Sequence, residues 1–192
     1  METKLMTFIN PYLSYIDDGE LFRKPFSWLY GLLALINLVL PIYIFYRAVN
    51  TGVFDSGALY IIVFLLVWIM IVFASWISIQ LWWDRKSKVI ATSSNEDEFV
   101  ATPVFSHFIQ TTGEWLGTWI IIVGFSYALL TTIILGGNAL YLSAQIGIPF
   151  LRTGFPFIIL MPVYGFLIIV ATRFLAEQIR AVASIAKNTR RS

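Results

Sequence analysis

Residues 58–83 read ALYIIVFLLVWIMIVFASWISIQLWW and contain no charged side chain. An α-helix rises about 1.5 Å per residue, so about 20 apolar residues are enough to cross the roughly 30 Å hydrocarbon core of a bilayer. A helix also satisfies all of its backbone hydrogen bonds within the segment, which hydrocarbon requires. This stretch therefore predicts a membrane-spanning helix.

Three further apolar runs of similar length occupy residues 26–46, 115–135 and 155–176. The whole chain is 58% hydrophobic and 12% charged, whereas soluble domains are about 25% charged. The connections between the runs are too short for a soluble domain of ordinary size. We predict one all-α domain over residues 1–192, an integral membrane four-helix bundle.

The basic residues are distributed unevenly between the segments that connect the predicted spans. Of the 13 lysines and arginines, only Arg47 and Arg152 fall in the two segments 47–57 and 136–154. Loops rich in Lys and Arg remain on the cytoplasmic side of a membrane. We therefore predict that both termini and the loop 84–113 are cytoplasmic, and that the two other loops face outward.

Three segments outside the spans have the pattern of amphipathic helices at the membrane surface. Residues 5–16 are too short to span the membrane and too apolar for a solvated tail. Residues 99–109 of the middle loop are likewise predicted to form a short amphipathic helix. Residues 177–192 extend the helical pattern of the last span into a cytoplasmic tail. An apolar stripe there is a candidate surface for a partner or for lipid headgroups. It consists of Leu175, Ile179, Val182 and Ala186.

Ionisable residues near hydrocarbon are expected to be paired. Glu114 begins the third span and Arg173 lies near the cytoplasmic end of the fourth, so the predicted topology places them at similar depth. We predict an inter-helix ion pair between them, with a structural role favoured over a substrate or proton site. No carboxylate lies at the middle of a span, where an ion-coupled carrier would ordinarily place one.

Small residues line one face of the third span. They are separated by four, seven and four positions, which stacks them on one side of a helix and permits close packing. Packing within the bundle and dimerisation are both compatible with this face. It consists of Gly113, Gly117, Gly124 and Ala128.

Residues for catalysis and metal binding are scarce. The chain has no cysteine and one histidine, and no H-E-x-x-H, G-x-S-x-G or phosphate-binding glycine motif. The basic residues lie near the predicted membrane ends instead of forming a soluble basic surface. We therefore expect no enzymatic activity, no cofactor, no metal site and no nucleic-acid partner.

The tail RFLAEQIRAVASIAKNT, residues 173–189, resembles the end of small bacterial multi-span integral membrane proteins of uncharacterised function. The resemblance implies a bacterial inner-membrane setting and no particular reaction. We expect a non-enzymatic accessory or scaffold subunit of an inner-membrane complex, whose partners are lipids, other membrane subunits or a second copy. A homo-oligomeric small channel or transporter is the alternative, and a lipid-modifying enzyme ranks third.

Overall fold

The computed structural model describes residues 4–17, 22, 24–93 and 101–190, and this part of the chain is helical without a strand. A five-residue π-helical turn at 120–124 joins the two α-helices of the third span into one continuous rod, and a second π-helical turn at 131–135 ends this span. The α-helices are α1 (Lys4–Asp17), α2 (Lys24–Asn50), α3 (Ala58–Ser93), α4 (Ala101–Trp119), α5 (Phe125–Leu130), α6 (Leu140–Ile146) and α7 (Phe155–Arg190).

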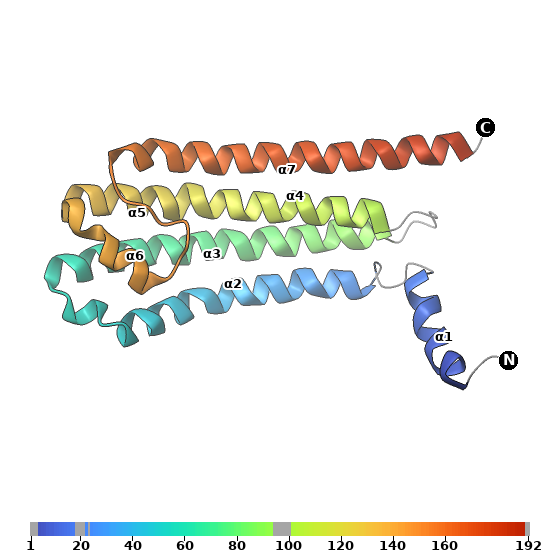
Figure 1. The fold of residues 1–192 in the computed structure, drawn as a ribbon, viewed down its shortest axis with the longest axis horizontal. Helices are drawn as coiled ribbons and strands as arrows, with labels where there is room; N and C mark the ends of the chain where they lie inside the picture. Colours follow the sequence, from blue (N-terminus) through green and yellow to red (C-terminus); the bar gives the residue numbers. More distant parts are fainter. Residues whose placement is uncertain (1–3, 18–21, 23, 94–100, 191–192) are drawn as a thin grey trace.

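Four of these segments are long and apolar enough to cross a membrane, as the four predicted spans require, and they define a multi-pass membrane protein. Figure 1 shows them lying side by side in the order α2, α3, α4 with α5, and α7. We call the end with residues 51–57 and 136–154 the loop end and the opposite one the terminal end. The four segments are Pro25–Asn50, Ala58–Ala91, Ala101–Leu135 and Phe155–Thr189.

The helices run farther at the terminal end than the hydropathy pattern predicts. The loop expected over 84–113 is largely helical, because α3 continues to Ser93 and α4 begins at Ala101. The separate surface helix predicted for 99–109 is therefore wrong from Ala101 onward, since that part is the beginning of α4. Pro103 sits in the first turn, where its missing N–H breaks no helical hydrogen bond. The polar centre of the predicted loop, 94–100, lies outside the described residues.

The predicted helix at 5–16 is present as α1, and Pro11 lies inside it. Tyr12 and Leu13 on α1 are exposed. Figure 1 shows α1 inclined to the long helices at the terminal end. Its predicted position along a membrane surface stays a prediction.

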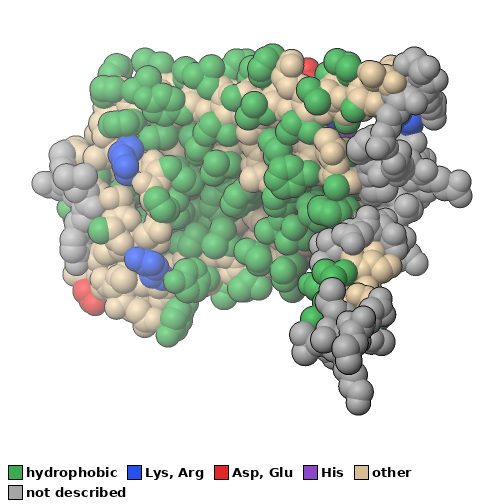
Figure 2. All heavy atoms as spheres, turned by 45° about the vertical axis from the view of Figure 1, so that its right-hand side comes forward, with side chains coloured by type: hydrophobic (Ala, Val, Ile, Leu, Met, Phe, Trp, Pro, Cys, Tyr) green, Lys and Arg blue, Asp and Glu red, His purple; other side chains and the backbone are tan. Residues whose placement is uncertain are grey.

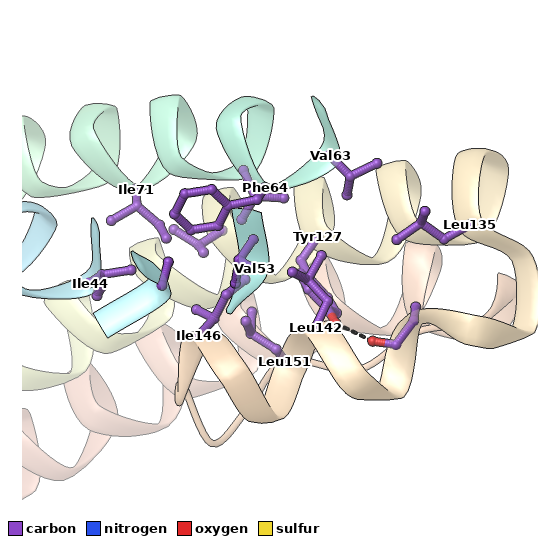
Figure 3. Close-up of a cluster of buried hydrophobic side chains, with 14 of the residues drawn as sticks. Ile44, Val53, Val63, Phe64, Ile71, Tyr127, Leu135, Leu142, Ile146 and Leu151 are labelled. Carbon is purple, nitrogen blue, oxygen red and sulfur yellow. Dashed lines mark hydrogen bonds between the residues drawn. The ribbon is translucent and has the colours of Figure 1, made fainter. Parts of the chain in front are cut away.

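The loop end is closed by a packed apolar core. Leu142 and Ile146 of α6 are fully buried with Leu151, and they join side chains of α3 and α5 in one cluster. Figure 3 shows these side chains pointing toward Phe64 and Tyr127. The Tyr127 hydroxyl donates a hydrogen bond of 2.9 Å to the carbonyl of Ala139, drawn as the dashed line in Figure 3. The connection 136–154 is thus a structured cap on the bundle.

Polar bonds fix this cap to the end of α2. Arg47 Nε donates to the carbonyl of Gln145 at 3.1 Å, and Gln145 Nε2 donates to the carbonyl of Thr51 at 2.8 Å. Gly147 ends α6 with a φ of 75°, in the left-handed region that favours glycine. A Cβ at this position would also collide with the Arg47 guanidinium. The arginine and the glycine therefore hold α6 against α2.

The small-residue face of the third span packs against α7 of the same chain. A Cβ on Gly117 would lie 2.5 Å from the carbonyl oxygen of Gly165, so the two backbones touch here. Gly113 lies against Thr172 and Gly124 against Met161. The close approach allows van der Waals contact between backbones, which drives helix association in lipid.

Ala128, the fourth residue of the face, is fully buried in α5. Since α5 also packs against α7, the helix pair keeps this contact beyond the π-helical turn. The face is thus occupied within the chain along its length.

Replacing Gly117 with Ala is expected to destabilise the protein by about 1–3 kcal/mol, because the added methyl group meets backbone that cannot move aside. Gly124→Ala is the matched control: its Cβ would lie 3.1 Å from the sulfur of Met161, a flexible side chain, and a much smaller effect is expected. Thermal unfolding in detergent measures both. Equal melting temperatures for the two variants would contradict the packing.

Candidate functional site

The most concentrated polar group of the described residues surrounds Glu114 at the terminal end. Arg85 Nη2 of α3 lies 2.8 Å from Glu114 Oε2, and Arg173 Nε of α7 lies 3.2 Å from Glu114 Oε1. Gln110 Nε2, one turn earlier on α4, donates to the same Oε1 at 2.9 Å. One carboxylate therefore joins α3, α4 and α7.

Burial differs sharply between the two arginines. Glu114 is only 8% exposed, and the side chain of Arg85 is 19% exposed, whereas that of Arg173 is 56% exposed. Removing one partner of a buried pair leaves an uncompensated charge, while an exposed pair contributes little. The Glu114–Arg85 bond is therefore the stronger structural link.

The cluster carries more positive than negative charge. Arg180 Nη1 donates to Gln110 Oε1 at 3.3 Å, which brings a third guanidinium beside the single carboxylate of Glu114. Arg173 remains largely open to the surroundings. A basic group at this depth suits the anionic headgroups of lipids or an acidic surface of a partner.

Sequence reasoning paired Glu114 with Arg173, and the structure brings these two together. It missed Arg85 and Gln110, because the sequence pattern predicts a loop over residues 84–113. Arg85 follows Trp82 by three residues, so a helix that continued past the span would place both on one face. Trp82 is buried, and this spacing was the signal that could have identified Arg85.

The apolar stripe predicted on the tail lies beside the α4 contact. Leu175 and Val182 are 52% and 66% exposed, Ala186 is exposed and Ile179 is half-buried. In contrast, Ala176 is fully buried. The stripe is therefore open while a neighbouring face of α7 is held by α4.

Neutral polar side chains within the spans bond from helix to helix. Trp115 Nε1 donates to Asn37 Oδ1 at 2.9 Å, which ties α4 to α2. Trp119 Nε1 donates to Ser78 Oγ at 2.8 Å, which ties α4 to α3. These bonds satisfy polar groups within hydrocarbon, as helix packing in membranes requires.

Two apolar grooves border the third span. The larger, about 530 Å³, lies between Ile120 of this span and α7, and the smaller, about 160 Å³, lies between α2 and α4. Phe150 of the cap lines both. Figure 2 shows a mainly hydrophobic surface in which small patches of Lys and Arg occur near the loop end.

No protein-family model, curated protein or solved structure matches this chain. Among the described residues, no three histidine, aspartate or glutamate side chains are arranged so that they could hold a metal ion. The charged cluster, the tail and the grooves are the features of the described residues that bear on function.

Three single substitutions rank the bonds of the charged cluster. We expect Glu114→Gln and Arg85→Gln each to destabilise the protein by about 1–3 kcal/mol, because each removes one charge of the largely buried Glu114–Arg85 bond. Arg173→Gln is expected to cost at most about 1 kcal/mol, because Arg173 is mostly exposed. Thermal unfolding in detergent measures the loss of stability in each variant. A larger loss for Arg173→Gln than for Arg85→Gln would contradict this ranking of the bonds.

Proposed function

We propose that this chain is a non-enzymatic scaffold subunit of a bacterial inner-membrane complex and that α7 presents its tail to a partner subunit. The observation that carries this proposal is the exposed apolar stripe on a helix that is fixed along a neighbouring face. The stripe is defined by Leu175, Ile179, Val182 and Ala186.

The length of α7 supports a docking role outside the bilayer. The helix has 36 residues. At about 1.5 Å per residue it is about 54 Å long, against about 30 Å of hydrocarbon. The tail therefore extends into the headgroup region and beyond it, where an apolar stripe is no longer covered by acyl chains.

The tail is preorganised for binding. Arg173 and Arg180 connect it to Glu114 and Gln110 of α4, so the stripe has a fixed orientation before a partner arrives. Preorganisation lowers the entropic cost of association. A helix with exposed apolar residues at intervals of three and four matches a groove on a partner, flanked by its own basic residues.

The predicted topology places this tail, the amino terminus and the connection between α3 and α4 in the cytoplasm, with α1 along the inner membrane surface. Basic residues concentrated at the terminal end support this orientation. The cap at 136–154 then faces outward.

A homo-oligomeric small channel or transporter is the alternative function. Such a protein needs a polar path, and the grooves seen here are apolar. The bonds of Asn37 and Ser78 to tryptophans favour packing over pore lining.

The orientation is tested by labelling, because the cysteine-free chain gives no background. Asp55→Cys at the loop end and Ser184→Cys on the tail are both exposed positions. In spheroplasts, a membrane-impermeant maleimide is expected to label the cysteine at position 55 directly, and the one at position 184 only after the membrane is permeabilised. The reverse labelling pattern would contradict the predicted orientation.

The docking role is tested by substituting Val182 with Glu, which places a charge in the centre of the stripe. We expect recovery of a stoichiometric partner subunit to fall about tenfold, equivalent to about 1.4 kcal/mol. Ser184→Glu adds the same charge at an exposed position off the stripe and should leave recovery unchanged. Native mass spectrometry of the protein extracted gently from its own membrane measures both.

Two results would count against the scaffold role. One is a symmetric homo-oligomer as the sole assembly, which would favour the channel or transporter. The other is an equal loss of partner in the Val182 and Ser184 variants, which would assign the effect to charge alone.

A further inference from the structure

We propose that the groove between α7 and the third span at Ile120 binds an acyl chain of an anionic phospholipid, whose phosphate contacts Arg152 at the loop end. This site is separate from the tail and does not depend on the scaffold role.

The shape of the groove fits a long apolar chain. Its wall on α7 extends from Phe157 to Ala171, a rise of about 21 Å. One leaflet contributes about 15 Å of hydrocarbon, so the groove is long enough for an acyl chain. The volume of about 530 Å³ is within the range of small-molecule sites. Met161, Tyr164 and Ile120 contribute to the lining. Because the groove opens on spanning helices, its natural occupant is a membrane lipid.

Arg152 supplies the charge at one end of this groove. It lines the groove, is exposed, and is held in place by its own loop. Nη1 donates to the carbonyls of Pro149 and Leu151 at 2.9 and 3.0 Å. An arginine has five N–H donors in a planar fork that fits phosphate, so the remaining donors are left for a ligand. The described lining contains no acidic side chain that would repel phosphate.

The second groove strengthens the assignment to a two-chain lipid. It also reaches Phe150, and its lining includes Tyr43, Leu116 and Gly147. Because Phe150 lines both grooves, the two acyl chains of one lipid can occupy them side by side. Arg47, packed against Gly147, adds a second cation at this end. A partner helix would fill one groove and would not explain the arginine that lines the larger one.

Native mass spectrometry of the delipidated full-length protein tests the proposal. The probes are palmitoyl-oleoyl phosphatidylglycerol and phosphatidylcholine with the same chains. We expect the unmodified protein to bind phosphatidylglycerol about tenfold more tightly, because a charge-assisted hydrogen bond selects an anionic headgroup. Arg152→Gln should remove this preference, and Arg152→Lys should retain most of it.

Filling the groove with a large side chain is an independent test of the proposal. Ala171→Trp places a large side chain in the groove from an exposed position and should weaken both lipids about tenfold. Val170→Trp is the matched control, since residue 170 is exposed and points about 100° away around the helix. Its binding should equal that of the unmodified protein.

Three results would overturn the proposal. The first is an unchanged preference for phosphatidylglycerol in the Arg152→Gln variant. The second is unchanged lipid binding in the Ala171→Trp variant. The third is that Ala171→Trp releases a bound protein subunit without loss of lipid. The Val182→Glu variant is expected to bind lipid normally, so failure of the scaffold role and failure of the lipid site give different outcomes.

Discussion

The antiparallel contact between α4 and α7 sets the positions of most features described above. Gly117 meets Gly165 backbone to backbone, and this contact fixes how far one helix is shifted along the other. From that contact toward the terminal end, residue numbers decrease along α4 and increase along α7. Glu114 thereby reaches Arg173, and one turn farther out Gln110 reaches Arg180. A single steric constraint thus aligns the members of the charged cluster on α4 and α7.

The sequence predicts the spans well because hydrocarbon imposes a simple rule on composition. It predicts the Glu114–Arg173 pairing for a related reason, since charges at the same depth must find partners. Hydropathy marks only the part of a helix inside the lipid, however. It therefore does not predict that α3 extends to Ser93 or that α4 begins at Ala101. Arg85 was missed with them, although its spacing from Trp82 carried the necessary signal.

The arginines at the two ends of the molecule have different hydrogen-bond partners. At the terminal end, charged side chains bond to one another around Glu114. At the loop end, Arg47 and Arg152 instead donate to backbone carbonyls of the cap. Carbonyls carry no net charge, so neither arginine is neutralised by these bonds. The cap thereby keeps positive charge at the membrane surface while its apolar side chains close the bundle.

The orientation of α7 about its axis links the groove to the tail. Residues that line the groove and residues of the exposed stripe recur at intervals of three or four from Phe157 to Ala186, which places them on one side of the helix. The glycine contact with α4 occupies the adjacent side and fixes the rotation. A rotation of α7 large enough to cover the stripe would separate Gly165 from Gly117 and also close the groove. The same packing therefore determines which face of α7 is exposed along the span and which face is exposed on the tail.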